Sequence, residues 1–167
     1  DVASKEVICR GLSMPHSPRW HKDALWLLNS GTGELCKLDP LNGELSVICR
    51  LPGFLRGLDF VGDFALIGMS KVREKHLFSG LPVSETFDEL LCGIAVINVA
   101  TGAPVGMFQF TGGCNELYEV LFLPGVQRPN ILNHLREESS QAITAPEFSY
   151  WLRPANERKD GSSKQGA

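Results

Sequence analysis

A strand–turn–strand pattern occurs twice in this chain, and it is the feature that most restricts the fold. Residues 38–43 (LDPLNG) and 97–102 (INVATG) are related by a shift of 59 residues. Each is the end of an apolar run followed by turn residues and a second apolar run, which is typical of a β-hairpin. Strand-length apolar runs bounded by Gly, Pro, Asn or Asp recur up to about residue 123, and helical periodicity is nearly absent before residue 126. We therefore expect an all-β chain with antiparallel strands.

The length of the repeat indicates the architecture. If residues 17–20, 57–60 and 117–120 are equivalent inner strands, the unit recurs after 40 and then 60 residues. A unit of about 40 residues is the length of a four-stranded propeller blade. The second unit is longer because residues 71–91 are inserted between its second and third strands. The sequence predicts a partial β-propeller of two blades plus one strand; the alternative is a β-sandwich of about nine strands.

The repeat also predicts the domain boundaries. Residues 1–129 are expected to form the blades, 130–153 a short helix or irregular extension, and 154–167 a disordered tail rich in Ser, Gly and Lys. Closed propellers have about 4 to 8 blades. We therefore expect the chain to need partners, either the missing blades of a longer parent protein or a second copy. Self-association would cover apolar end surfaces carrying Trp20, Phe60, Leu117 and Val120.

Composition excludes several classes of function. The net charge is -3, and the 21% of charged residues form no block of one sign, so no nucleic-acid partner is expected. No apolar run is long enough to span a membrane. The five cysteines show no CxxC or Cys/His metal spacing. They favour small buried thiols of a reducing compartment, and hence the cytoplasm, over a disulfide or a nucleophile.

Candidate functional residues follow from the face on which propeller loops open. Loops leading into the inner strands and loops joining the second and third strands share the usual ligand face. His16, Arg56 and Glu116 are equivalent positions before the three inner strands. Together they are suited to binding an anion or moving a proton. The alternative is that they make only structural hydrogen bonds at the rim.

The second class of loop supplies the other candidates. Asn29, Ser30 and Ser70 are expected on these loops, as is the insertion, which contains Arg73 and Glu74. We expect the insertion to protrude as a charged, solvated loop, with a lid over the channel mouth as the alternative. The candidate binding residues are therefore His16, Asn29, Ser30, Arg56, Ser70, Arg73, Glu74 and Glu116.

Two resemblances accompany this pattern. The strings SMPHSPRWH at 13–21, SGTGEL at 30–35, LPGF at 51–54 and FSGLP at 78–82 resemble an uncharacterised family of conserved hypothetical proteins, which implies no function. Residues 15–43 resemble, more weakly, the gluconolactonase and senescence-marker type of six-bladed propeller. That resemblance implies a divalent cation in the central channel, although Pro15-His16-Ser17-Pro18 lacks the glutamate expected there.

No catalytic motif is present, so the sequence favours a non-enzymatic propeller module without a cofactor, which binds a small molecule or a protein. The alternative is a lactonase-like or other channel hydrolase that uses His16, Glu116 and a divalent cation.

Overall fold

The computed structural model describes residues 1–72, 80–127, 129, 142–145 and 148–151. It divides into two compact units, Asp1–Leu123 and Pro124–Ala167. In the part of the chain that the structure describes, no helix is long and apolar enough to cross a membrane.

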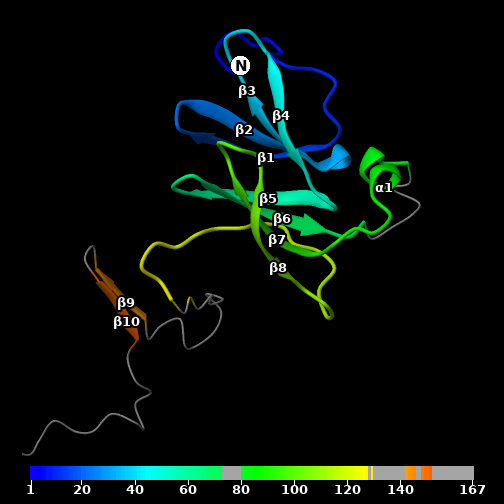
Figure 1. Cartoon of the computed structure of the whole chain (residues 1–167). Coiled ribbons are helices and arrows are strands. Elements are labelled where there is room, and N and C mark those ends of the chain that lie inside the picture. Colours follow the sequence, from blue (N-terminus) through cyan, green and yellow to red (C-terminus); the bar gives the residue numbers. More distant parts are fainter. Residues whose placement is uncertain (73–79, 128, 130–141, 146–147, 152–167) are drawn as a thin grey trace, which may run out of the picture. The chain divides into compact units, whose positions relative to one another are not determined.

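The first unit consists of two antiparallel four-stranded sheets (Figure 1). Sheet I contains β1 (Pro15–His21), β2 (Ala24–Asn29), β3 (Glu34–Leu38) and β4 (Leu45–Arg50). Sheet II contains β5 (Phe54–Val61), β6 (Phe64–Ser70), β7 (Gly93–Asn98) and β8 (Pro104–Gln109). In both sheets the strands follow one another in chain order, and the predicted all-β class is confirmed.

The two sheets repeat each other in register. Arg19 pairs with Trp26 in sheet I, and Asp59 pairs with Leu66 in sheet II, so both partners move by 40 residues. Each first strand has a bulge in front of this pair, where Ser17 and Gly57 adopt left-handed backbone conformations. Gly57 is required there because a Cβ would collide with the backbone of the segment around Val120.

The two predicted hairpin turns are also equivalent. The N–H of Gly43 donates to the carbonyl of Asp39 at 2.9 Å, and the N–H of Gly102 donates to the carbonyl of Asn98 at 2.8 Å. Both glycines have positive φ, of 76° and 70°. The shift of 59 residues seen in the sequence is therefore a structural repeat.

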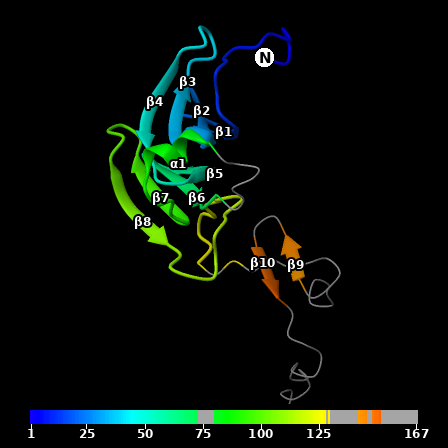
Figure 2. The ribbon, with the colours of Figure 1, turned by 90° about the vertical axis from the view of Figure 1, so that its right-hand side faces the viewer.

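The main core lies between the two sheets. Leu28 and Leu35 of sheet I are fully buried against Leu55, Leu58 and Ile67 of sheet II. The first strands β1 and β5 contact each other, and Figure 2 shows β4 and β8 on the opposite side of the unit. A second, smaller cluster covers the other face of sheet I; it contains Leu27, Cys36 and Leu38 with Ile8, Cys9, Leu12, Leu25 and Leu45.

The described part of the insertion between β6 and β7 is more ordered than the loop that we predicted. It forms a short helix, α1 (Pro82–Thr86), beside the 3-10 turn η1 (Ser30–Thr32). Val83 is fully buried and lies against Gly33, and the N–H of Leu91 donates to the carbonyl of Pro52 at 2.7 Å. The charged side chains Glu85, Asp88 and Glu89 are exposed as expected for a solvated segment, but residues 82–86 are helical and Val83 anchors them to the core. Residues 73–79 lie outside the described part.

The second unit contains a strand pair. β9 (Ala142–Ala145) and β10 (Phe148–Trp151) are antiparallel, with Phe148 opposite Ala145. In the stretch 130–153, where we expected a short helix or irregular extension, the described residues are thus strands. Residues 130–141 and the predicted tail at 154–167 lie outside the described residues.

Candidate functional site

His16, Arg56 and Glu116 lie at the starts of the three inner segments, and with Ser30 and Tyr118 we refer to these residues as the inner-strand cluster. His16 is half-buried, and its ring meets the Phe54 ring edge-on at 5.5 Å. Its Nδ1 lies 2.9 Å from the Met14 carbonyl and 3.0 Å from Ser30 Oγ. A carbonyl only accepts, so we assign the proton to Nδ1. Nε2 is then the nitrogen that can accept a hydrogen bond from a ligand.

Arg56 is oriented by two neighbours. Its Nη1 lies 3.7 Å from Glu116 Oε1, and its Cζ lies 4.4 Å from the centre of the Tyr118 ring. The Arg56 side chain is 28% exposed. Stacking on the aromatic face fixes the plane of the guanidinium, and the ion pair at 3.7 Å is longer than a charge-assisted hydrogen bond. The cluster therefore presents an ordered guanidinium that reaches solvent.

Ser30 and Ser70 have matching structural roles. Ser30 Oγ donates to the Leu55 carbonyl at 2.5 Å, and Ser70 Oγ contacts both the carbonyl and the N–H of Leu117 at 3.2 and 2.9 Å. Both serines are buried. Each ties the end of a second strand to the start of the next inner segment, and Ser30 also positions His16.

Asn29 belongs to a separate buried network with Glu34, Thr32 and Arg50. Its Oδ1 accepts from the N–H of Ser13 at 2.7 Å, and its Nδ2 donates to Glu34 Oε2 at 2.9 Å. Arg50 donates to Glu34 Oε1 through Nε and Nη2 at 3.0 and 2.7 Å. Burial raises the pKa of Glu34, but the hydrogen bonds from Thr32, Asn29 and Arg50 outweigh it and hold this pKa below 4.5.

This network was missed from the sequence, although a signal was present. Extending the hairpin register back from the 39–43 turn brings Glu34 opposite Arg50, with one irregularity between Leu35 and Cys36. A carboxylate opposite a guanidinium on neighbouring strands predicts an ion pair.

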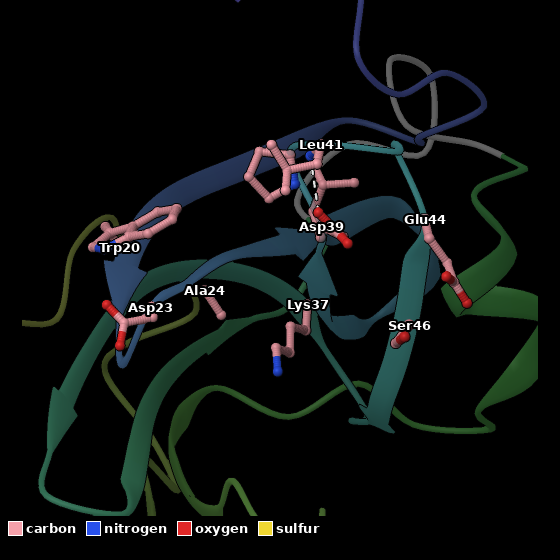
Figure 3. Close-up of a pocket in the computed structure, with 10 residues that line it drawn as sticks. Trp20, Asp23, Ala24, Lys37, Asp39, Leu41, Glu44 and Ser46 are labelled. Atoms are coloured by element: carbon pink, nitrogen blue, oxygen red, sulfur yellow. Dashed lines mark hydrogen bonds between the residues drawn. The ribbon is translucent and has the colours of Figure 1, made fainter.

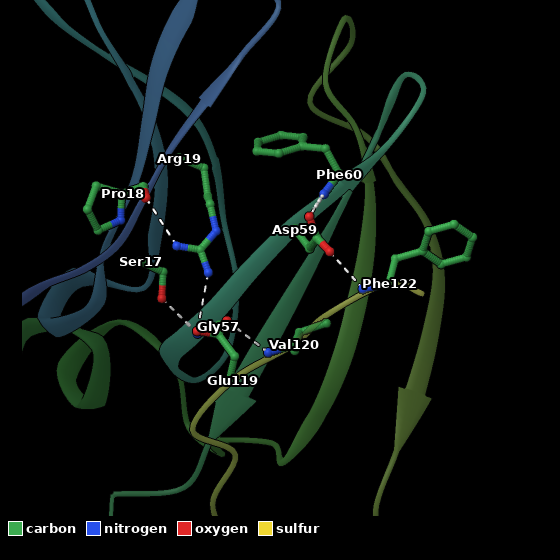
Figure 4. A network of polar contacts seen from close by, with 9 residues as sticks. All are labelled: Ser17, Pro18, Arg19, Gly57, Asp59, Phe60, Glu119, Val120 and Phe122. Carbon is green, nitrogen blue, oxygen red and sulfur yellow. Dashed lines mark hydrogen bonds and ion pairs between the residues drawn. The ribbon is translucent and has the colours of Figure 1, made fainter. Parts of the chain in front are cut away.

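A second row of equivalent positions lies three residues further along each inner segment. Arg19 Nη2 donates to Glu119 Oε2 at 3.2 Å (Figure 4). Asp59 accepts from the N–H groups of Phe60 and Phe122 at 2.8 and 2.7 Å. The alignment that selects His16, Arg56 and Glu116 also selects these three residues, so they too could have been found. The Asp59–Phe122 bond holds the third inner segment against sheet II, and the Arg19–Glu119 bond ties it to β1 of sheet I.

The remaining candidates and a groove lie elsewhere. Arg73 and Glu74 are outside the described residues. An open groove of about 570 Å³ lies on sheet I, and it contains none of the predicted site residues (Figure 3). We name it the Trp20 groove; it is lined by Trp20, Asp23, Ala24, Lys37, Leu38, Asp39, Pro40, Leu41, Glu44 and Ser46.

A comparison with known families identifies the family of this chain. The model of the family described as "Domain of unknown function (DUF4915)" matches residues 1–132. The chain belongs to this family. The expected resemblance to an uncharacterised family is thereby confirmed, and membership of DUF4915 indicates no activity. No curated protein matches the chain.

Metal ligands and thiols add little to the site of this DUF4915 chain. Within residues 1–72 and 80–127, no three His, Cys, Asp or Glu side chains gather as a metal site would require. All five cysteines are free. Burial raises the pKa of Cys36 to about 12 and those of Cys49 and Cys92 to about 11, so these three thiols are protonated at neutral pH.

Proposed function

We propose that the chain contributes two blades and the start of a third to a β-propeller, and that this propeller is a binding module rather than an enzyme. The repeat of 40 residues, the meander order of each sheet and the contact between β1 and β5 support the propeller. The third inner segment continues the pattern, because Ser70 donates to the carbonyl of Leu117 as Ser30 donates to the carbonyl of Leu55.

The proposed ligand is a small molecule that carries a carboxylate or phosphate group. The observation that carries this proposal is the contrast between two arginines. Arg50 is closed on Glu34 by two bonds of 2.7 and 3.0 Å, whereas Arg56 is stacked on Tyr118 with a carboxylate oxygen only at 3.7 Å. A planar guanidinium with a fixed orientation is suited to receiving an anionic oxygen.

His16 would complete the recognition. Its Nε2 accepts a hydrogen bond from a hydroxyl of the ligand, because Nδ1 is held by Met14 and Ser30. The proposed ligand therefore combines an anionic group with at least one hydroxyl. The alternative hydrolase is supported only by the resemblance over residues 15–43, and no contact within the inner-strand cluster favours it.

The test is a titration followed by two-dimensional ¹H–¹⁵N NMR. Citrate, gluconate and inorganic phosphate are the probes, and glucose is the uncharged comparison. We expect at least one anion to shift the signals of the Arg56 side chain and the His16 ring, and the Arg56→Gln variant to bind it at least tenfold more weakly.

The matched control is Arg10→Gln, which removes an exposed arginine outside the cluster. It should leave the affinity unchanged. Circular dichroism checks that both variants are folded. The proposal is overturned if no anion shifts these signals, or if Arg56→Gln and Arg10→Gln weaken binding equally.

A further inference from the structure

Residues 7–10 repeat part of an outer strand. They read Val-Ile-Cys-Arg, and the same four residues stand at 47–50 in β4, 40 positions later. This is the spacing that relates sheet I to sheet II. The sequence thus identifies residues 7–10 as the counterpart of β4.

Packing agrees with this identity. Ile48 and Cys49 of β4 pack on the core beside sheet II, and the Ile48 carbonyl lies against Gly102. Ile8 and Cys9 pack on the outer cluster of sheet I, and the Ile8 carbonyl lies against Gly43. Residues 7–10 therefore pack against sheet I in the same way as β4 packs against sheet II.

One edge of this segment differs from β4. β4 pairs with β3, whereas residues 7–10 belong to none of the sheets in the described structure. A segment that packs like a fourth strand without a third strand beside it offers backbone N–H and C=O groups for pairing.

Within the Trp20 groove, Trp20 and Leu38 lie on the same face of sheet I as residues 7–10, because both pair with Leu25 of the outer cluster. The equivalent of Trp20 on sheet II is covered. Phe60 is the counterpart of Trp20; it stacks on His21 with ring centres 4.1 Å apart and also contacts Trp26 at 5.5 Å. Trp20 itself is 63% exposed. Sheet I therefore lacks the neighbour that it provides to sheet II.

The charge of the missing neighbour can be inferred in the same way. Asp63 on sheet II forms an ion pair with Lys22, which comes from the first hairpin of sheet I. The counterpart of Asp63 is Asp23, which is exposed in the Trp20 groove. A neighbour that fits the groove carries a basic residue at its first hairpin and a planar ring just before it.

We propose that the Trp20 groove and residues 7–10 together form the docking surface for a three-stranded antiparallel β-meander of this same repeat, supplied by polypeptide outside these 167 residues. Residues 7–10 become its fourth strand. A second copy of the chain is a poorer fit, because each described three-strand meander already has a fourth strand: β4 follows β1–β3 and β8 follows β5–β7. The proposal rests on the propeller architecture proposed above.

The test supplies such a meander from the chain's own sequence. Residues 11–46 are fused before Val7 in place of residues 1–6, so that the junction with residues 7–10 reproduces the junction with 47–50. Hydrogen exchange measured by mass spectrometry follows the backbone amides of residues 7–14. We expect their exchange to slow at least tenfold relative to the unextended chain.

The matched control carries one additional glycine between the fused segment and Val7. Because side chains alternate along a strand, this insertion turns Ile8 and its neighbours to the wrong face, and protection should be lost. If the fused chain does not unfold cooperatively, residues 11–46 are added instead as a separate peptide and the same amides are followed.

The outcomes are separable. Exchange that is unchanged in both formats, or slowed equally with the extra glycine, overturns the proposal. Slow exchange in the unextended chain that depends on its concentration, together with a doubled mass in light scattering, shows that a second copy occupies the surface and also overturns it. Anion binding at Arg56 is measured separately and does not depend on the exchange of residues 7–14. If the anion binds but the exchange is unchanged, the docking surface is wrong and the proposed function still stands.

Discussion

Glu34 offers the sharpest test of how sheet I is held together. Its side chain is 9% exposed and accepts bonds from Asn29, Thr32 and Arg50. Removing it with Glu34→Ala leaves the buried Asn29 amide without this acceptor, which costs about 1–3 kcal/mol. The Arg50 guanidinium is 59% exposed and rehydrates, so the lost ion pair adds only about 0–1 kcal/mol. We expect a total loss of about 3 kcal/mol.

Glu34→Gln separates charge from shape. Both carboxylate oxygens face donors, so the amide NH₂ of glutamine must meet a donor on one side. The less costly orientation points the NH₂ toward the exposed Arg50 and keeps the oxygen on Asn29 and Thr32. We expect a loss of about 1.5 kcal/mol, from the ion pair and from the weakening of charge-assisted bonds to neutral ones.

Urea unfolding at pH 7, with the m value held constant, measures both losses. Glu6→Ala is the control, since Glu6 is exposed near the N-terminus. If Glu34→Ala costs less than about 0.5 kcal/mol, as the control should, the network does not stabilise the fold and the reasoning is refuted.

The same residue predicts a pH dependence. The pKa of Glu34 in the folded chain lies below its ordinary value of 4.5. Its ionised form therefore contributes stability above pH 4.5, and this contribution is lost as the pH falls through the folded-state pKa. The difference in free energy of unfolding between the wild type and Glu34→Gln should be constant from pH 7 to 5.5 and shrink toward pH 3. A difference that grows on acidification contradicts the assignment.

Three further predictions concern single positions. Gly57→Ala should destabilise the chain by about 2–4 kcal/mol in urea unfolding, because the new Cβ meets backbone atoms at a position with positive φ. Gly62→Ala is the control: it has positive φ but open space around it, and it should cost only about 1 kcal/mol. Equal losses would refute the close approach at Gly57. Ser30→Ala should cost about 1–2 kcal/mol and shift the His16 ring signals in NMR, and an unmoved ring would show that Ser30 does not position it. Cys92 and Cys114, whose sulfurs are 3.8 Å apart, should be the first pair that diamide oxidises to a disulfide; peptide mapping checks this, and earlier linkage of another pair would contradict it.

Much of the fold could be predicted because its signals are local. The hairpin turns at 38–43 and 97–102 carry Asn-Gly and Thr-Gly, and the apolar runs have strand length, so the two meanders follow from turn chemistry and alternation. The burial of Val83 could not be predicted in this way. It depends on the contact with Gly33, fifty residues earlier, and a short polar segment with one valine has the composition of a loop.

The repeat predicts which residues stand at the starts of the inner segments, but not which atoms they contact. Counting by the repeat placed His16, Arg56 and Glu116 at equivalent points, and the structure brings Arg56 and Glu116 to 3.7 Å. Counting by the repeat could not show that Ser30 and Ser70 are bonded to the next inner segment. Each serine hydroxyl donates to a backbone carbonyl that is 25 or 47 residues away in the sequence. The identity of residues 7–10 and 47–50 is visible in the sequence alone. Only the structure shows that both segments pack in the same way, because the Ile8 carbonyl lies against Gly43.

The comparison of repeats separates structural positions from functional ones by a physical criterion. Where both units keep the same residue, as in the Ser30 and Ser70 pair, the hydroxyl donates to a carbonyl of the next inner segment in each unit, and its role is to join neighbours. Where the units differ, the residue either forms a closed network of short bonds, as Glu34 does with Arg50 at 2.7 and 3.0 Å, or makes a longer ion pair, as Arg56 does with Glu116 at 3.7 Å. Only the second kind can exchange its partner for a ligand, since closed buried bonds would be broken at a cost of several kcal/mol. Arg56 meets this condition and His16 adds the acceptor Nε2, so the proposed ligand site is centred on them rather than on the more tightly bonded Glu34 network.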